Sequence, residues 1–316
     1  MTDKIAAVFP GQGSQWVGMG QDLVEAYPAA RETFAEADEC LGFALSRLCF
    51  EGPEETLNDT YNTQPAIFTT SMAVWRALHS AGWSVQPAFA AGHSLGEYSA
   101  LVAAGAFTFA DGLRLVRERG RLMKLAGERN PGGMAAILQL DVKTLADICQ
   151  QASQATGKVV QVANYNSPGQ IVISGDQVAL EQAMQLAQAA GARRVTRLAV
   201  SIASHSPLMA IVSDEFRRAV EATPIQQPRL PVVANVTAQP LTSVDGIRHE
   251  LVAQLTSSVR WVESVQYMAE QGVTRFIEIG PKEVLTGLIP RINKGLQAVA
   301  CGTAAGVQAI LASAGG

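Results

Sequence analysis

Apolar residues fall into two kinds of pattern along the chain. Short apolar runs bounded by glycine, proline or charged residues are typical of buried strands, and they predict strands at residues 5–9, 231–237, 274–279 and 296–301. Longer segments with apolar positions three and four apart predict helices, at residues 21–50, 64–81, 95–104, 109–127, 247–255 and 261–271. Gly52-Pro53 should interrupt the helices near residues 51–55. Alternating strands and helices favour an α/β fold.

The middle of the chain has a different order of elements. Asn130-Pro131-Gly132-Gly133 marks a boundary. Beyond it the pattern predicts strand, helix, strand, strand, helix, strand, at 134–140, 142–155, 159–164, 170–174, 177–190 and 194–199. This βαββαβ order is typical of the ferredoxin-like split motif. We therefore expect a small subdomain at 132–199, inserted into a large α/β subdomain formed by residues 1–131 and 200–316.

Gly92-x-Ser94-x-Gly96 has the spacing of a nucleophile elbow, in which a strand turns sharply into a helix. Glycines flank the central serine in such a turn because side chains there would collide. Ser94 is thus a candidate nucleophile. The preceding residues 87–91 are alanine-rich and only weakly strand-like, so an ordinary glycine-flanked turn is the alternative.

A glycine-rich loop, residues 10–15, follows the first predicted strand. It lacks the Gly-Lys-Ser/Thr of a phosphate loop and the spacing of a dinucleotide-binding loop. Ligand sites in open α/β sheets lie at this end of the strands. The backbone N–H groups of the loop could bind an oxyanion, and a plain turn is the alternative.

Arg119 is predicted to lie on the apolar face of its helix. Leu115 and Val116 precede it by four and three positions, and Leu122 and Met123 follow at the same spacing. A buried guanidinium needs an anionic partner or costs several kcal/mol. The partner could be a protein Asp or Glu, or the side chain could extend outward to solvent. A bidentate substrate carboxylate is the third possibility.

His205 follows the last strand of the insert, where the chain rejoins the large subdomain. A cleft between subdomains is a favoured binding place. His93, the immediate neighbour of Ser94, should point away from it, so His205 is the better candidate base. A structural, hydrogen-bonded histidine is the alternative.

Composition narrows the classes of function. A net charge of -4 without a long basic run gives no general attraction to nucleic acid. No apolar run is long enough for a membrane span and the N-terminus lacks signal-peptide regions, so we expect a cytoplasmic protein without membrane contact. The cysteines form no CxxC pair, which suggests buried reduced thiols and no metal site; they are Cys40, Cys49, Cys149 and Cys301.

These motifs together resemble the malonyl-CoA:acyl carrier protein transacylase family and the related acyltransferase domains of polyketide synthases. The resemblance runs almost the full length of the chain. It rests on Phe9-Pro10-Gly11-Gln12-Gly13-Ser14-Gln15, Gln64-Pro65-Ala66, Gly92-His93-Ser94-Leu95-Gly96-Glu97-Tyr98, Arg119-Gly120, Asn164-Tyr165-Asn166-Ser167-Pro168-Gly169-Gln170, Ser204-His205, Gln254-Leu255 and Gly280-Pro281.

The resemblance implies specific roles for residues of this chain. Ser94 would attack the thioester of malonyl-CoA while His205 takes its proton. The backbone N–H groups of Gln12 and Leu95 would hold the oxyanion, and Arg119 would bind the malonyl carboxylate. The group then passes to the phosphopantetheine thiol of an acyl carrier protein, without a cofactor.

The resemblance also implies an α/β-hydrolase-like large subdomain and a ferredoxin-like small one. The histidine would be oriented by the main-chain carbonyl of Gln254 and not by an aspartate. The segment Ile202-Ala203-Ser204 matches neither usual extender signature of polyketide acyltransferases. Ser204-His205 does resemble the stand-alone malonyl enzymes, so malonyl is favoured, with methylmalonyl as an alternative.

Two rival functions remain at this point. An acyl hydrolase of the same fold would release acyl groups from carrier proteins, although such relatives lack the arginine. A non-catalytic carrier-protein docking module would not need Ser94, His205 and Arg119 together. The sequence does not separate fatty-acid from polyketide synthesis, and it gives neither the preferred carrier protein nor the oligomeric state.

Basic residues near the predicted cleft could attract an acidic carrier protein. We call this set the basic rim: Arg117, Arg121, Lys124, Arg129 and Arg194. Arg114, Arg117 and Arg121 have charged neighbours at helical spacing and are expected to be solvated.

Overall fold

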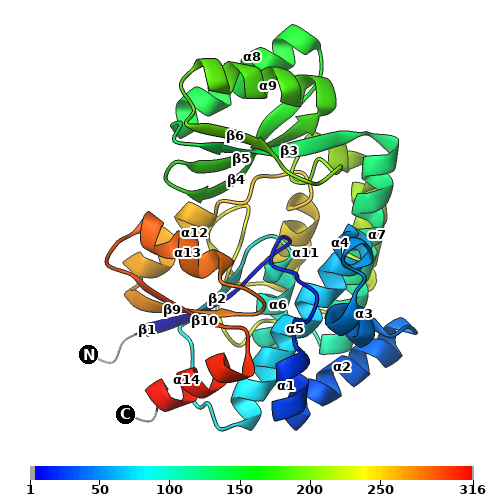
Figure 1. The fold of residues 1–316 in the computed structure, drawn as a ribbon, viewed down its shortest axis with the longest axis vertical. Helices are drawn as coiled ribbons and strands as arrows, with labels where there is room; N and C mark the ends of the chain where they lie inside the picture. The colour runs from blue at the N-terminus through cyan, green and yellow to red at the C-terminus, as the bar shows by residue number, and fades with distance from the viewer. Residues whose placement is uncertain (1–3, 315–316) are drawn as a thin grey trace.

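The computed structural model describes residues 4–314 and shows two stacked parts (Figure 1). The lower part contains a six-stranded sheet of order β10-β9-β1-β2-β7-β8, in which only β8 is antiparallel to its neighbour. Its strands are β1 (Lys4–Phe9), β2 (Phe89–Gly92), β7 (Val232–Val233), β8 (Pro240–Leu241), β9 (Val273–Ile279) and β10 (Gln297–Cys301).

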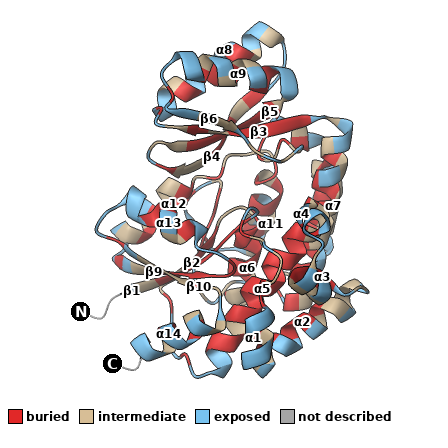
Figure 2. Cartoon of the chain, in the orientation of Figure 1, coloured by how far each residue is buried: buried red, intermediate tan, exposed pale blue. Residues whose placement is uncertain are grey.

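Helices cover both faces of this sheet, and Figure 2 shows the central strands buried between them. Consecutive residues of β1 face opposite cores: Ala7 and Phe9 pack into one, Ala6 and Val8 into the other. A strand covered on both sides reads as a continuous apolar run, which is why residues 5–9 are recognisable in the sequence.

The lower part contains the helices that pack around the six-stranded sheet. They are α1 (Gln21–Ala26), α2 (Pro28–Leu41), α3 (Leu45–Glu51), α4 (Glu54–Asn58), α5 (Thr60–Ser80), α6 (Gly96–Ala103), α7 (Phe109–Arg129), the 3₁₀ helix η1 (Pro207–Val212), α10 (Ser213–Ala222), α11 (Val244–Ala253), α12 (Trp261–Glu270), α13 (Val284–Ile292) and α14 (Ala304–Ala314).

The upper part is a four-stranded antiparallel sheet with two helices on one face. Its elements are β3 (Gly132–Leu138), α8 (Val142–Thr156), β4 (Val160–Ser167), β5 (Gln170–Asp176), α9 (Gln177–Ala189) and β6 (Arg194–Arg197). The strand order β4-β5-β3-β6 is that of the ferredoxin-like split βαβ motif, so the predicted βαββαβ order is confirmed. The fold class, an α/β-hydrolase-like part with a ferredoxin-like part, is confirmed as well.

The two faces of the upper sheet have different environments. Ile137, Leu145 and Leu180 belong to the core between the sheet and helices α8 and α9. Met134 and Val172 lie on the opposite face in a separate small cluster. This second face turns toward the lower part, and both residues line the cavity described below.

Several predicted elements differ from the structure. The helix expected at 21–50 is three helices, broken at Tyr27 and at 42–44, where Gly42 adopts a left-handed conformation. The strand expected at 231–237 has only two residues, because the chain leaves the sheet after Val233. Helix α10 was not predicted, although its two buried apolar residues, Phe216 and Val220, lie four positions apart on one face.

Within residues 4–314, no helix is both long enough and apolar enough to cross a membrane. The four cysteines are free thiols; Cys40 is half-buried and the other three are buried.

Candidate active site

Ser94 lies at the turn between β2 and α6. Its φ of 52° is in the left-handed region, which is uncommon for a residue with a side chain. A Cβ at Gly92 would approach Gly96 C to 1.9 Å, and one at Gly96 would approach Phe9 O to 2.0 Å. Both flanking positions therefore require glycine, and the segment is a strand–turn–helix and not an isolated turn.

Two buried side-chain amides hold the backbone of Ser94. The N–H of Ser94 donates to Asn235 Oδ1 at 2.7 Å, and its C=O accepts from Gln254 Nε2 at 3.0 Å. Asn235 Nδ2 also donates to Gly92 O at 2.7 Å. The strained turn is thus fixed from both sides by residues more than 140 positions away in the chain.

His205 is hydrogen-bonded to Ser94, with Nε2 2.7 Å from Oγ. Nδ1 lies 2.8 Å from the main-chain oxygen of Gln254, so Nδ1 carries the proton and Nε2 is left as an acceptor. Burial, and secondarily the positive charge of Arg119, lower the pKa of His205 to about 3. The ring is therefore neutral at physiological pH and able to take a proton from the serine.

The guanidinium of Arg119 reaches the same place from α7. The residue is only 2% exposed. Nη1 donates to Gln64 Oε1 at 2.7 Å, and Nη2 donates to Gln254 Oε1 at 2.9 Å and to Ser94 Oγ at 3.1 Å. Its Nε has no hydrogen-bond partner among the described residues.

Two of the three possibilities raised for Arg119 are therefore wrong. The side chain does not extend to solvent, and it forms no ion pair with any Asp or Glu of residues 4–314. A buried guanidinium bonded only to neutral acceptors retains its capacity to bind an anion.

Gln12 and Leu95 line the same cavity as Ser94, His205 and Arg119. Within the described part of the chain, neither backbone N–H makes a hydrogen bond. Leu95 is the first residue beyond the elbow, at the N-terminus of α6, where N–H groups lack helical partners. Both donors are thus free to receive a ligand oxygen.

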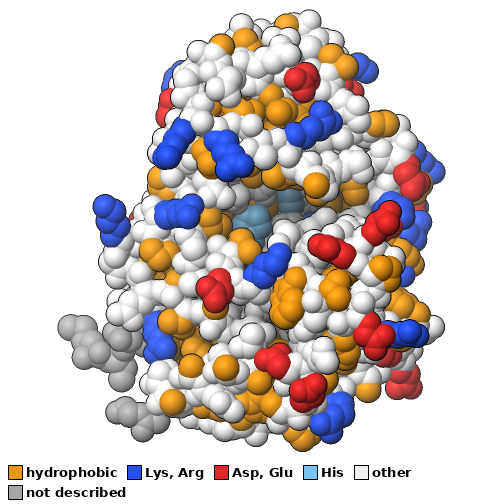
Figure 3. Space-filling model, viewed as in Figure 1, with side chains coloured by type: hydrophobic (Ala, Val, Ile, Leu, Met, Phe, Trp, Pro, Cys, Tyr) orange, Lys and Arg blue, Asp and Glu red, His pale blue; other side chains and the backbone are white. Residues whose placement is uncertain are grey.

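The cavity has a volume of about 180 Å³ and lies between the two parts of the protein. Figure 3 shows histidine side chains within a hollow between the upper and lower parts. Its other wall is apolar and is formed by Met134 and Val172 of the upper part together with Leu198 and Val200, which follow β6. A wider groove of about 690 Å³ shares four lining residues with the cavity, which are Gln12, Thr60, Val200 and Ile202.

His93 does not bond to Ser94, as predicted. Its Nε2 lies 2.8 Å from Asn166 Oδ1, and its ring packs edge-on against Trp261 with centroids 5.8 Å apart. Burial lowers its pKa. The residue contributes to the wall of the cavity, whereas His205 contacts the serine.

Three side chains of this site were assigned no role from the sequence: Gln64, Glu97 and Asn235. All three are buried. Glu97, a charged residue in the otherwise apolar α6, was a signal that the sequence offered. Burial, and next the neighbouring Glu250 carboxylate, raise the pKa of Glu97, while N–H donors of the site oppose this shift.

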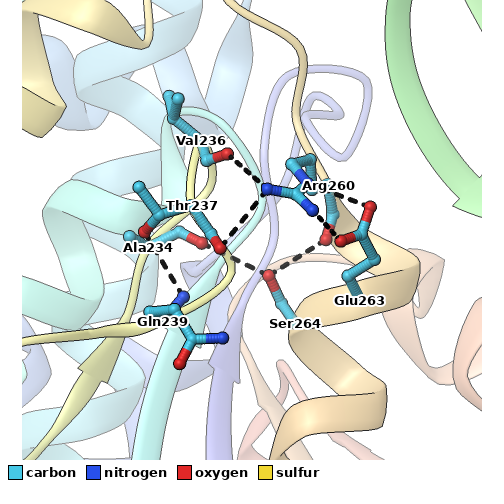
Figure 4. A network of polar contacts seen from close by, with 7 residues as sticks. All are labelled: Ala234, Val236, Thr237, Gln239, Arg260, Glu263 and Ser264. Atoms are coloured by element: carbon cyan, nitrogen blue, oxygen red, sulfur yellow. Dashed lines mark hydrogen bonds and ion pairs between the residues drawn. The ribbon is translucent and has the colours of Figure 1, made fainter.

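The loop that carries Asn235 is braced by α12 (Figure 4). Arg260 Nη1 donates to the carbonyls of Val236 at 3.4 Å and Thr237 at 3.5 Å, and Ser264 Oγ donates to Ala234 O at 3.3 Å. Glu263 pairs with the same arginine and holds it in place. Asn235 is therefore presented to the elbow from a fixed loop.

The basic rim is less exposed and more neutralised than expected. Arg117 was predicted to be solvated, and this is wrong: it is half-buried, with its guanidinium 3.1 Å from the Tyr61 ring centroid. Arg121 pairs with Glu118 and Glu215. Lys124 pairs with Asp59 at 2.5 Å, and the acidic partners of Arg121 and Lys124 reduce the net positive charge of the basic rim. Arg129 and Arg194 are exposed.

Comparison with known proteins places the chain among the acyl transferase domains. The family model for the acyl transferase domain matches residues 7–307. The chain is 47% identical to the malonyl CoA-acyl carrier protein transacylase of Bacillus subtilis, over 94% of this chain and 93% of that protein. It is 48% identical to the protein of the same name from Escherichia coli K12, over 94% and 95%.

Solved structures agree with this relationship. A structure described as a type II PKS acyl-carrier protein in complex with its malonyl-transacylase matches with a TM-score of 0.95 and 45% identity, covering 98% of this chain and 99% of that one. This chain therefore belongs to the malonyl-CoA:acyl carrier protein transacylase family within the acyl transferase domains.

Proposed function

We propose that this enzyme transfers the malonyl group of malonyl-CoA to the phosphopantetheine thiol of an acyl carrier protein, through a malonyl-Ser94 ester. The observation that supports the proposal most strongly is the pair of contacts made by the hydroxyl of Ser94. Ser94 Oγ lies 2.7 Å from a neutral histidine and 3.1 Å from a buried arginine that has no acidic partner in the described chain.

The first half-reaction forms the ester. Ser94 Oγ attacks the thioester carbonyl carbon and its proton passes to His205 Nε2. The oxyanion accepts hydrogen bonds from the N–H groups of Gln12 and Leu95, each contributing about 3–4 kcal/mol to the transition state. The C–S bond then breaks, and His205 returns the proton to the departing CoA sulfur.

The second half-reaction repeats these steps with a new thiol. The carrier protein's phosphopantetheine thiol gives its proton to His205 and attacks the ester carbonyl. Ser94 leaves and recovers the proton from His205. No cofactor or metal takes part in either half, so substrate alternation alone accounts for the transfer.

Arg119 supplies the preference for a carboxylated acyl group. Its guanidinium lines the cavity and has an unpartnered Nε, and it can pair with the free malonyl carboxylate in bidentate fashion. An acetyl group would leave the buried charge with neutral partners only, which a site built for an anion rejects strongly. One extra methyl changes binding by only about 1–3 kcal/mol, so discrimination against methylmalonyl is the weaker of the two.

Malonyl is the proposed substrate. The methyl branch of a methylmalonyl group would contact the apolar wall of the cavity near Ile202. The acyl carrier protein and the CoA thioester are the proposed partners, and a cytoplasmic location is the proposed one. The pathway served is fatty-acid or polyketide synthesis.

A competition experiment tests this proposal against its rivals. Malonyl-, methylmalonyl- and acetyl-CoA compete for transfer onto one purified carrier protein, with release of free acid measured in parallel. We expect malonyl to dominate, methylmalonyl to follow and acetyl to be nearly excluded. Rapid hydrolysis that is independent of carrier protein would instead make the chain a hydrolase.

A further inference from the structure

Glu97 is fully buried at the first turn of α6, one turn beyond the nucleophile. A buried carboxylate is costly unless hydrogen bonds satisfy it. It does not touch the substrate cavity, whose lining residues do not include it. Its contacts therefore have to explain its presence.

All the polar partners of this carboxylate are N–H donors. Oε1 accepts from Asn235 N at 2.9 Å and from Asn235 Nδ2 at 3.2 Å. Oε2 accepts from Gln254 Nε2. A protonated acid would direct its O–H at a donor, so these N–H groups favour the ionised carboxylate and oppose the rise in the pKa of Glu97 that burial and Glu250 cause.

The two amides that Glu97 binds lead to every reacting group of the site. Asn235 Oδ1 accepts from the N–H of Ser94, and Gln254 Nε2 donates to its C=O. Gln254 Oε1 accepts from Arg119, and the main-chain oxygen of Gln254 accepts from His205. The Glu97 carboxylate is thus connected to Ser94, His205 and Arg119 through two successive hydrogen bonds, with Asn235 or Gln254 as the intermediate residue.

We propose that Glu97 is a positioning residue that fixes the orientation of the Gln254 and Asn235 amides, and through Gln254 sets the preference of Arg119 for a carboxylated acyl group. This inference deepens the proposed function and rests on it. The Gln254 amide has two possible orientations that differ by exchange of its O and N atoms. The Glu97 carboxylate and the C=O of Ser94 both accept from Nε2, and together they select the orientation that presents oxygen to the guanidinium.

The variant Glu97→Gln has nearly the same shape but cannot satisfy these contacts. If its oxygen faces Asn235, its NH₂ faces Gln254 Nε2, and two donors meet. Gln254 cannot relieve this by turning over, since its Oε1 would then face the C=O of Ser94 and its NH₂ would face Arg119, so the amide shifts away from the guanidinium. If its oxygen faces Gln254 instead, its NH₂ opposes the two Asn235 donors, and the hold on Ser94 is lost.

The matched control is Glu278→Gln. Glu278 is also a buried acid, 1% exposed, and it accepts from the N–H groups of Leu285 at 2.9 Å and Thr286 at 2.7 Å. It lies on β9 and does not line the cavity. The control therefore loses a comparable buried charge without touching the amides of the site.

The test measures kcat/KM for malonyl-CoA and for acetyl-CoA with holo carrier protein, together with the thermal midpoint of each variant. We expect Glu97→Gln to lower kcat/KM for malonyl-CoA about 10- to 100-fold, and to lower the malonyl-to-acetyl ratio at least about 10-fold. Glu278→Gln should lower the thermal midpoint and leave that ratio within about twofold of wild type.

A double variant separates positioning from loosening of the fold. In an Arg119→Ala background, Glu97→Gln should leave the malonyl-to-acetyl ratio unchanged, because the arginine through which it acts is gone. If Glu97→Gln does not fold, Gln254→Met provides the same test, since it keeps the main-chain carbonyl that His205 needs and removes the amide. That variant should also lower the ratio.

The inference is overturned if a folded Glu97→Gln or Gln254→Met enzyme keeps the wild-type ratio, or if Glu278→Gln lowers the ratio equally. These outcomes differ from failure of the proposed function. If the proposed function were wrong, the wild-type enzyme itself would form no malonyl ester on Ser94.

Discussion

Arg119→Ala is the substitution whose consequence follows most directly from the site. The side chain is 2% exposed and donates to Gln64, Gln254 and Ser94, all neutral acceptors. Its removal would leave a malonyl carboxylate without a charged partner in a buried cavity. Breaking one side of a buried, hydrogen-bonded charge pair costs about 3–5 kcal/mol.

This cost converts to a large kinetic effect, since about 1.4 kcal/mol corresponds to a tenfold change in rate. We expect kcat/KM for malonyl-CoA to fall by about two to four orders of magnitude. Acetyl-CoA carries no carboxylate and loses none of this energy, so its relative use should rise. The assay is transfer of each acyl group to holo carrier protein, followed by mass spectrometry of the carrier.

Arg114→Ala is the matched control on the same helix. Arg114 is exposed, and its one ion pair among residues 4–314 is with Asp111 at 3.4 Å, a surface contact worth about 0–1 kcal/mol. Its activity should equal that of wild type. A malonyl rate for Arg119→Ala equal to that of the control would refute the carboxylate-binding role and make Arg119 a structural residue.

Three further predictions concern the elbow, the base and the rim. Gly96→Ala places a Cβ 2.0 Å from Phe9 O and should lower the free energy of unfolding by at least about 1–3 kcal/mol, whereas Gly287→Ala in α13 meets open space and should raise it by about 0.4–1 kcal/mol; equal urea midpoints would contradict this. Because burial lowers the pKa of His205 from 6.5 to about 3, its neutral form persists far below pH 6.5, and kcat/KM should show no histidine limb near 6.5. By the same shift, the contribution of His205 to the free energy of unfolding is fully present above pH 6.5 and is lost as the pH falls from 6.5 toward 3. A histidine limb near pH 6.5 in kcat/KM, or a thermal midpoint that does not change between pH 6.5 and 3, would count against the shifted pKa. Added salt should slow transfer to carrier protein only modestly, since three members of the basic rim are paired or half-buried; free pantetheine as acceptor gives the salt-independent baseline.

Local motifs allowed much of the fold to be predicted. The strand at residues 5–9 and the βαββαβ order are recognisable because a doubly covered strand and an amphipathic helix each leave a regular apolar period. Strand β2 left only a weak signal. Two of its four residues are alanine, and it is a strand because β1 and β7 pair with it on both sides.

The site divides in the same way. The elbow around Ser94 and the apolar setting of Arg119 depend on neighbours within a few positions, so the sequence carries them. The partners Gln64, Asn235 and Gln254 approach from 55 to 160 residues away. No local period encodes such contacts, and only the folded sheet brings them together.

The malonyl-Ser94 ester is the central claim, and intact-protein mass spectrometry tests it most directly. Purified enzyme is mixed with malonyl-CoA in the absence of any carrier protein, its intact mass is measured, and a digest of the same sample is then searched for the modified residue. One malonyl group on Ser94, absent from Ser94→Ala, is the predicted result. No adduct on the wild-type enzyme, or an equal adduct on Ser94→Ala, would contradict the account.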